Sequence, residues 1–342
     1  MKIWIDILTP KQLLFSEPII ERLEEKHEIL CTSREYHEVS KLAKIRHFDL
    51  IFVGKHGGGD KKSKLKASIE RMEKLSKKIK RFEPDLVISF GSPEAARISF
   101  GLGIKHIMFC DSPHANAVMK LTLPLIQKLL IPYVIPKKEF SKYGIHEKNI
   151  VQYKAIDAAV TMKRKIREDL NSPFKNNNKK NILIRVEEEE AAYTSKSSKI
   201  IPIIQKITKD YKNENVVVLG RYTKQINNLQ KIIGNKVKIV KMSFDGKFLL
   251  NKTDIFIGSG GTMTAESALM GIPTISYNAV PNIVEEFLVK KSLVKRETNP
   301  NKVSNHIKKI FETKNDQNQK RAKKIVKEME DPIEKLIKII KN

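Results

Sequence analysis

The most constraining stretch of the chain is residues 254–276, where a short apolar run is followed at once by small residues. Residues 254–257 are rich in strand formers, and the next four residues are Gly258, Ser259, Gly260 and Gly261. A helical pattern begins at Thr262, the expected N-cap, and stops at Gly271 with a proline just beyond. Residues 274–277 predict a further strand. The order strand, glycine-rich turn, helix, strand indicates a parallel βαβ unit.

A turn of this kind has a physical use. Glycines let the backbone approach a ligand closely, and the amides at a helix N-terminus favour negative charge. A diphosphate is the ligand that such a turn suits best. Glu266 lies in the first turns of the same helix, where its carboxylate can accept hydrogen bonds from two vicinal hydroxyls, as in a ribose. The alternative is a plain strand-to-helix connection with a solvated glutamate.

Strand and helix patterns alternate along the whole chain. In the first half we expect strands at 2–8, 27–32, 50–53, 86–90 and 106–110, and helices at 15–26, 36–45, 61–81 and 93–100. In the second half we expect strands at 181–186, 216–219, 237–240, 254–257 and 274–277, and closing helices at 300–313, 316–330 and 333–340. This alternation predicts an α/β protein with two Rossmann-like, doubly wound sheets facing a cleft.

The stretch 171–181 is polar, low in complexity and turn-forming, so we expect a linker there. It separates a first domain, residues 1–170, from a second domain, residues 182–315. Residues 316–342 are expected to form a C-terminal helix that can pack back on the first domain.

Composition narrows the function further. The 342 residues are 40% hydrophobic and 30% charged and contain two cysteines, which suits a soluble, cytoplasmic protein without a disulfide framework. We find no apolar run long enough for a transmembrane helix and no signal-peptide pattern. The net charge of +26 invites an anionic partner. Lysine far outnumbers arginine, however, and readers of nucleic acid rely on arginine, so we do not expect nucleic acid as the main partner.

Two segments suggest a membrane surface as an alternative to a plain solvated exterior. The expected helix 61–81 has a heavily basic face and an apolar stripe: Leu65, Ile69, Met72, Leu75 and Ile79. Residues 118–136 are apolar and broken by prolines. A core helix and strand is the simpler interpretation of 118–136. Together, apolar and basic surface would favour peripheral contact with anionic lipid.

Ligands of doubly wound sheets bind beyond the carboxyl ends of the strands, so polar residues after each strand are the candidates. In the second half, Arg185 and Arg221 follow strands and suit a diphosphate, with a structural ion pair as the alternative for each. In the first half, Asp111 and His114 pair a carboxylate with an imidazole within one turn, which suits general acid–base catalysis. The alternative is an aspartate that caps a helix and a histidine in a loop. The remaining candidates, on the acceptor side, are Asp6, Thr9, Arg34, His56, Gly57, Ser92 and Glu94.

Several of these segments carry a resemblance. The motifs are WIDI with TP near the start, TSREY at 32–36, GKHGG at 54–58, FGLGI at 100–104, DSPHA at 111–115, and GGTM followed by Glu266. The last resembles the nucleotide-sugar site of GT-B-fold enzymes, which include glycosyltransferases and UDP-N-acetylglucosamine 2-epimerases. Over most of its length the chain is identified as a member of the domain-of-unknown-function family 354.

The resemblance implies a UDP-sugar substrate bound by residues 182–315, an acceptor or catalytic role for residues 1–170, and no cofactor or metal ion. It also implies a uracil contact at Phe244, with a position in the core as the alternative. It departs from the 2-epimerases at Gly91-Ser92, where those enzymes have Gly-Asp, so one acid–base carboxylate of their mechanism is missing. The spacing from Ser259 to Glu266 is closer to transferases that use lipid-linked acceptors. We therefore expect a UDP-sugar glycosyltransferase acting on a lipid-linked or glycan acceptor. The alternatives are a sugar-nucleotide epimerase and a non-catalytic nucleotide-binding protein, and a homo-oligomer is left open.

Overall fold

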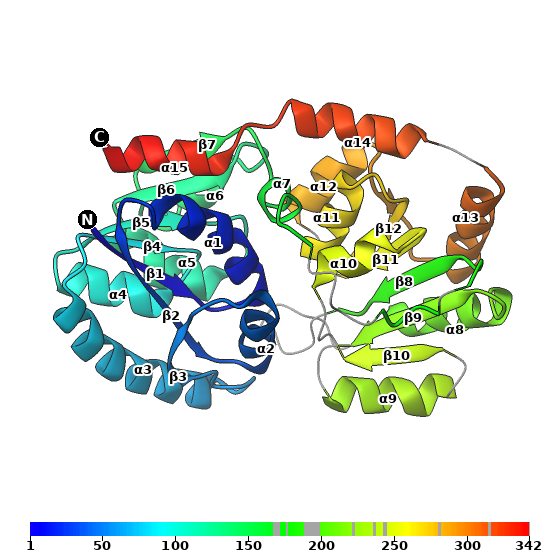
Figure 1. Cartoon of the computed structure of the whole chain (residues 1–342), viewed down its shortest axis with the longest axis horizontal. Coiled ribbons are helices and arrows are strands. Elements are labelled where there is room, and N and C mark those ends of the chain that lie inside the picture. The colour runs from blue at the N-terminus through cyan, green and yellow to red at the C-terminus, as the bar shows by residue number, and fades with distance from the viewer. Residues whose placement is uncertain are drawn as a thin grey trace. The chain divides into compact units, whose positions relative to one another are not determined.

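The chain forms two compact units in the computed structural model. The structure describes residues 1–341 apart from 167–171, 176, 188–198, 221–222, 235–236, 242–244, 280–281 and 314–315. The first unit comprises Met1–Arg164 and Met329–Asn342, and the second comprises Lys165–Glu328 (Figure 1). The division falls before the stretch 171–181 that we expected to be a linker.

Unit 1 is built on a seven-stranded parallel sheet in the order β3-β2-β1-β4-β5-β6-β7. Its strands are β1 (Lys2–Ile7), β2 (Glu28–Glu35), β3 (Ile51–Lys55), β4 (Leu86–Ser89), β5 (Lys105–Phe109), β6 (Lys128–Pro132) and β7 (Ile150–Tyr153). Its helices are α1 (Pro10–Leu23), α2 (His37–Arg46), α3 (Lys61–Phe82), α4 (Pro93–Gly101), α5 (Asn116–Thr122), α6 (Lys138–Ser141), α7 (Ala158–Thr161) and α15 (Pro332–Lys341), with short 3₁₀ turns η1 (Leu123–Leu125) and η2 (Glu147–Asn149).

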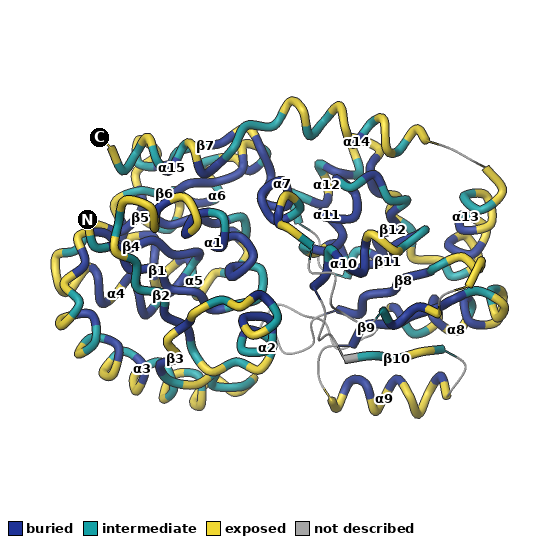
Figure 2. Tube along the Cα trace, in the orientation of Figure 1, coloured by how far each residue is buried: buried dark blue, intermediate teal, exposed yellow. Residues whose placement is uncertain are grey.

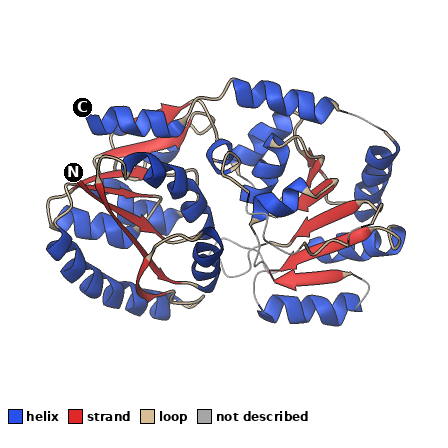
Figure 3. Cartoon of the chain, viewed as in Figure 1, coloured by secondary structure: helices blue, strands red, loops and turns tan. Residues whose placement is uncertain are grey.

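Unit 2 is built on a six-stranded parallel sheet in the order β10-β9-β8-β11-β12-β13. Its strands are β8 (Asn181–Arg185), β9 (Asn215–Gly220), β10 (Lys238–Lys241), β11 (Ile255–Gly258), β12 (Thr274–Ser276) and β13 (Lys295–Arg296). Its helices are α8 (Ile200–Asp210), α9 (Thr223–Ile233), α10 (Gly246–Asn251), α11 (Thr262–Leu269), α12 (Ile283–Lys290), α13 (Pro300–Glu312) and α14 (Gln317–Lys327). The expected fold class of two doubly wound parallel sheets is confirmed (Figure 3).

The sheets are buried between helical layers, and the central strands are mostly dark blue in Figure 2. In unit 1 the rings of Phe15, Phe90 and Phe109 pack together under α1, with centroids of Phe15 5.2 and 5.0 Å from the other two. On the other face, Trp4 and Val87 pack against Leu75 of α3 and Ile98 of α4. Each such side chain contributes about 1.5–3 kcal/mol by leaving water, so burial on both faces explains the long apolar strands.

Helix α1 begins five residues earlier than the expected start at 15. Thr9 caps it by accepting a hydrogen bond from the Gln12 amide, and Pro10 occupies the first helical position, where its missing N–H costs nothing. The sequence TPKQ is therefore a helix start rather than only a turn. This difference matters because it places Lys11 in the first turn of α1, at the carboxyl edge of the sheet.

The apolar stripe that we expected along the basic helix α3 is only partly buried. Leu75 and Ile79 are buried, but Leu65 and Ile69 are 62% and 54% exposed, so the predicted apolar stripe is covered only in its second half. The apolar stretch 118–136 is mostly core, because its strand β6 lies inside the sheet with Leu129, Leu130 and Ile131 fully buried. Among the described residues, no helix combines the length and apolar character needed to cross a membrane.

The C-terminal residues do not form one element. Helix α14 belongs to unit 2, where it contacts α11, whereas α15 belongs to unit 1. Asp331 and Glu334 at the start of α15 form ion pairs with Arg22 of α1 at 2.7 and 2.9 Å. The expected C-terminal segment 316–342 is thus divided between the two units, between Glu328 and Met329.

Candidate functional site

The loop after β11 has a shape that only small residues allow. Gly260 has a positive φ of 96°, which L-residues rarely adopt. A side chain at Gly258 would start 2.5 Å from Phe256 Cε1 and from Thr264 Oγ1, so this glycine is required by packing. Gly261 is the N-cap of α11, and Thr262, which we expected in that role, is the first helical residue. At Gly261 an added Cβ would meet nothing nearer than Ser259 Oγ, 4.0 Å away.

The N-terminus of a second helix braces the same loop. Asn282 caps α12 by accepting from the Glu285 amide, and its Nδ2 donates to the Gly260 carbonyl at 3.0 Å. The buried Glu285 carboxylate is paired with Arg296 of β13. Its Cγ would be 3.3 Å from a Cβ at Gly260. The backbone of the loop is therefore held in a defined conformation before any ligand arrives.

Arg185 lies at the end of β8, the strand that pairs directly with β11. It is 5% exposed, and its Nη1 donates to the carbonyl oxygens of Leu219 and Gly220 at the end of β9. Tyr277, after β12, donates to the carboxylate of Glu187 at 2.6 Å. Burial and the Glu187 charge raise the pKa of Tyr277 well above its ordinary value, so the phenol stays neutral. These groups gather at the carboxyl edge of the second sheet.

The other expected nucleotide contacts are less defined. Glu266 is only 2% exposed, so its expected contact with a ribose requires that ligand to reach a nearly buried carboxylate. Arg221 and Phe244 lie outside the residues that the structure describes.

In unit 1, Asp111 does not stand alone after β5. The Lys11 ammonium forms an ion pair with the Asp111 carboxylate and a second one with Asp157, at 2.8 Å. Ser112 Oγ donates to Asp111 at 2.8 Å, and Tyr153 donates to Asp157. Burial alone would raise the pKa of Asp111, but the Lys11 charge and the hydrogen bonds from Lys11 and Ser112 together outweigh it and lower that pKa. For Asp157, burial dominates and raises the pKa to about 6.

His114, expected beside Asp111, is exposed on the loop before α5. Loss of part of the water around its ring lowers the pKa of His114, despite the opposing influence of the Asp111 charge. The imidazole is therefore neutral near pH 7 and able to accept a proton. The structure thus keeps both residues as acid–base candidates, with Asp111 in a charged cluster and His114 at its margin.

Asp6 is a structural hub rather than an open acceptor contact. It is 1% exposed and receives hydrogen bonds from Arg71 at 2.6 Å, Thr32 at 2.7 Å and Ser92 at 2.6 Å. Burial opposes the ionised form, but Arg71 and these hydrogen bonds lower the pKa of Asp6. Ser92 is also the N-cap of α4. A carboxylate this fully engaged is suited to holding strands and helices together.

The remaining acceptor-side candidates surround this hub. Glu94 accepts from Ser68 of α3 at 2.8 Å and lies 3.6 Å from Arg71. Arg34 is partly buried nearby, and burial lowers its pKa. The His56 ring stacks on Tyr36 with centroids 4.9 Å apart. A Cβ at Gly57 would lie 2.5 Å from Lys64 Cα, so this glycine lets the loop pack on α3. Thr9, which we also expected here, is the cap of α1.

Sequence reasoning missed Lys11, Arg71 and Asp157. Lys11 lies before the helix that we expected at 15–26, and Arg71 belongs to the basic helix expected at 61–81. Asp157 follows β7, a strand that we did not predict. Recognising Thr9-Pro10 as a cap followed by a first helical residue would have placed Lys11 at the ligand edge of the sheet.

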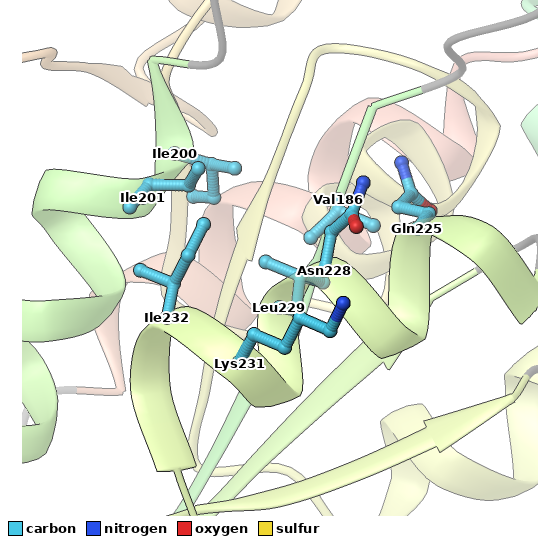
Figure 4. A pocket seen from close by; sticks show the side chains of 8 residues that line it. All are labelled: Val186, Ile200, Ile201, Gln225, Asn228, Leu229, Lys231 and Ile232. Atoms are coloured by element: carbon cyan, nitrogen blue, oxygen red, sulfur yellow. The ribbon is translucent and has the colours of Figure 1, made fainter.

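Unit 2 also holds an apolar cavity of about 260 Å³ between α8 and α9. Figure 4 shows Ile200 and Ile201 of α8 close to Ile232 of α9, with Val186 and Gln225 on the opposite side. Gln225, Asn228 and Lys231 supply its polar groups. Residues 188–198, which precede α8, lie outside the described part of the chain. Within that part, no cluster of three His, Cys, Asp or Glu side chains is arranged to hold a metal ion.

Two parallel-sheet α/β units place this chain in the class of proteins with a GT-B-like fold. The chain belongs to the DUF354 family, described as proteins of unknown function, whose model matches residues 1–342. One relative is the uncharacterised protein MJ0665 of Methanocaldococcus jannaschii. It is 29% identical over 355 residues, which cover 100% of this chain and 98% of the relative.

Solved structures are similar in fold at low sequence identity. The UDP-GlcNAc 2-epimerase of Neisseria meningitidis, crystallised with UDP-GlcNAc, superposes with a TM-score of 0.75 at 16% identity and covers 100% of both chains. The glycosyltransferase of kitacinnamycin gives a TM-score of 0.63 at 12% identity, with 96% of this chain and 94% of that chain covered. At such identities the likeness establishes the fold alone.

Proposed function

We propose that this protein binds a UDP-sugar and transfers its sugar to an acceptor hydroxyl. The observation that favours it most is the braced loop Gly258–Gly261, which leads into the N-terminus of α11. It follows β11, the strand that pairs with the strand of Arg185. The first amides of a helix have no acceptor within the helix, and glycines let a diphosphate approach them. Structural neighbours crystallised with UDP or UDP-GlcNAc are consistent with that ligand.

In this proposal each unit has its own chemical task. As the bond from the anomeric carbon to the diphosphate oxygen breaks, its electron pair stays with UDP. The loop amides and Arg185 stabilise that growing negative charge. The acceptor oxygen bonds to the anomeric carbon and gives up its proton. Asp111 is the group that takes this proton, with His114 as the other candidate base.

Epimerisation is the second candidate, because the fold matches a UDP-GlcNAc 2-epimerase over the full length of both chains. Ser92 argues against it. Where the resemblance places an acid–base aspartate, this chain has a buried serine that caps α4 and donates to Asp6. A hydroxyl held in this way cannot replace a carboxylate that moves protons.

Incubation with UDP-GlcNAc, with and without an acceptor glycan or lipid, tests the proposal. A transferase releases UDP in proportion to acceptor. An epimerase converts the sugar nucleotide to its 2-epimer without acceptor, and a binding protein leaves it unchanged. Asp111→Asn should lower kcat by ~10²–10⁴-fold with a nearly constant KM. The matched control is Asp85→Asn, at the start of β4, which should behave as wild type.

For the acceptor, we propose a lipid-linked molecule at an anionic surface. The exposed Leu65 and Ile69 lie among lysines on α3, and this combination favours anionic lipid. Vesicles with anionic lipid should bind the protein, and salt should reverse much of the binding. The variant Leu65→Ser with Ile69→Ser should bind them more weakly. Equal binding to neutral vesicles, or none to either, would leave α3 a solvated helix.

A further inference from the structure

Three charged side chains from separate parts of unit 1 meet at one point. Lys11 comes from the first turn of α1, Asp111 from the loop after β5, and Asp157 from the N-cap of α7. The Lys11 ammonium contacts both carboxylates, and it lies 4.5 Å from the centroid of the Phe90 ring. The residues are up to 146 positions apart in the chain, so the fold assembles this group.

The two carboxylates differ in access. The Asp111 side chain is 18% exposed, whereas that of Asp157 is 3% exposed and accepts a hydrogen bond from Tyr153. With both ionised, the three groups carry one excess negative charge in a poorly solvated place. Two carboxylates that share one cation resist ionising together, so one of them retains a proton more readily. Asp157 is the more enclosed of the two carboxylates, so burial disfavours its ionised form more strongly than that of Asp111.

We propose that Asp111, Lys11 and Asp157 form one acid–base unit, in which Asp111 meets the reacting hydroxyl and Lys11 and Asp157 are positioning residues that set its basicity. The proposal rests on the proposed function for the reaction concerned. The shared protonation of the three groups does not need a substrate to be measured.

Protonation of Asp157 changes what Lys11 does. While Asp157 is neutral, the Lys11 charge acts on Asp111 alone and makes it a weak base. Once Asp157 ionises, it competes for that charge and Asp111 becomes more basic. Burial raises the pKa of Asp157 to about 6, so the change occurs close to neutral pH. The other groups facing the cluster are Tyr153, Cys110, Ser112 and His114. Tyr153 and Cys110 are neutral because burial raises their pKa values.

The reaction step balances without any further reagent. The acceptor hydroxyl passes its proton to a carboxylate oxygen of Asp111 as its oxygen bonds to the anomeric carbon, and UDP leaves with the bonding electrons. Asp111 then releases the proton to water. Lys11 stays an ammonium throughout, because the two carboxylates hold its pKa well above the usual range in spite of burial.

The first test is substrate-free. Carboxyl carbons of ¹³C-labelled aspartate are followed by NMR from pH 4 to 8 in wild type, Asp157→Asn and the control Asp85→Asn. One aspartate should titrate near pH 6 in wild type and in the control, and that titration should be absent in Asp157→Asn. Lys11→Met should move the titration midpoints of Asp111 and Asp157 to higher pH, whereas Lys11→Arg should largely preserve them. If no aspartate titrates above pH 5 in wild type, the proposal is wrong.

The second test uses kcat against pH with UDP-GlcNAc and acceptor. In wild type kcat should rise about tenfold through pH 6, and Asp157→Asn should remove that rise while KM stays within about twofold. A rise that persists in Asp157→Asn would overturn the role of Asp157. The protein could lack activity and still show the NMR titration near pH 6 in wild type but not in Asp157→Asn. That result would contradict the proposed function and support the shared protonation. A tryptophan emission spectrum that matches that of wild type shows that each variant is folded.

Discussion

The carboxyl edges of the two sheets are built in different ways. In unit 1 the edge is lined by charges that pair with one another, such as Asp6 with Arg71 and Lys11 with Asp111 and Asp157. In unit 2 the edge is shaped by backbone: a glycine loop braced by Asn282, and an arginine donating to carbonyl oxygens. The edge of unit 1 is specified mainly by long-range ion pairs, and the edge of unit 2 mainly by the conformation of its backbone.

The difference separates two kinds of vulnerability. A buried ion pair is costly to break, because the partner that remains is a desolvated charge. A glycine loop is costly to alter only where a side chain would collide or where φ is positive. Substitutions at the edge of unit 1 should therefore reduce stability, whereas some in unit 2 should reduce binding without affecting the fold.

The largest expected effect is at Arg71. Arg71→Met leaves the Asp6 carboxylate buried without its main partner and should destabilise unit 1 by ~3–5 kcal/mol. Trp4, the only tryptophan, is fully buried in the same unit and donates to Thr32, which also contacts Asp6. Urea unfolding followed by its fluorescence is therefore the measurement.

Arg81→Met is the matched control, since Arg81 is exposed on the same helix. It should stay within about 0.5 kcal/mol of wild type, as surface substitutions usually do. Equal stability of the two variants would mean that the Asp6–Arg71 pair does not hold the unit together.

His106 predicts a pH dependence of unit 1. It is fully buried between Ser89 and Ser99, and burial lowers its pKa to about 3. The unfolded chain takes up this proton near pH 6.5, so the stability contributed by neutral His106 is present above that pH and is lost as pH falls toward 3. The loss should be roughly 2–3 kcal/mol between pH 6 and 4.

Asp157 contributes in the opposite direction. Its folded pKa is raised, so its contribution to stability decreases as pH rises from 4 to 6. The measurement is therefore the difference between wild type and His106→Gln in urea unfolding at several pH values. The exposed His146→Gln is the control. A His106→Gln profile parallel to that of wild type would contradict the assignment.

Glycine substitutions in unit 2 are expected to change stability less than the loss of an ion pair in unit 1. Gly258→Ala puts a methyl group 2.5 Å from Phe256 and Thr264 and should cost ~1–3 kcal/mol. Gly261→Ala has room and a negative φ, so its stability should stay near wild type. If the loop holds a diphosphate, Gly261→Ala should still weaken UDP binding several-fold. Unchanged affinity in a stable Gly261→Ala protein would place the ligand elsewhere.

The sequence alone was sufficient for features that are local in the chain. The βαβ unit at 254–276, the parallel sheets and most helix positions followed from periodicity, glycines and caps. The loop Gly258–Gly261 and the strand-end position of Arg185 were found in this way. Short elements without a strong pattern, such as β7, α7 and β13, were not predicted.

Pairing between distant charges could not be predicted. Asp6 and Arg71 are 65 residues apart, and nothing in a lysine-rich helix distinguishes the one arginine that turns inward. Asp6 was expected to face an acceptor and is instead fully engaged inside the unit. Likewise, Asp111 was expected to pair with His114, but in the structure its carboxylate forms an ion pair with Lys11, which also contacts Asp157. Local patterns thus located the polar edge, while tertiary packing decided which charges are open.

The central claim is that the glycine loop of unit 2 binds the diphosphate of a UDP-sugar. Isothermal titration calorimetry with UDP and with uridine tests it most directly, using wild type and Gly261→Ala. We predict that wild type binds UDP at least tenfold more tightly than uridine, and that Gly261→Ala loses most of this difference while uridine affinity hardly changes. Equal affinity of wild type for UDP and uridine, or no binding of UDP, would contradict the claim.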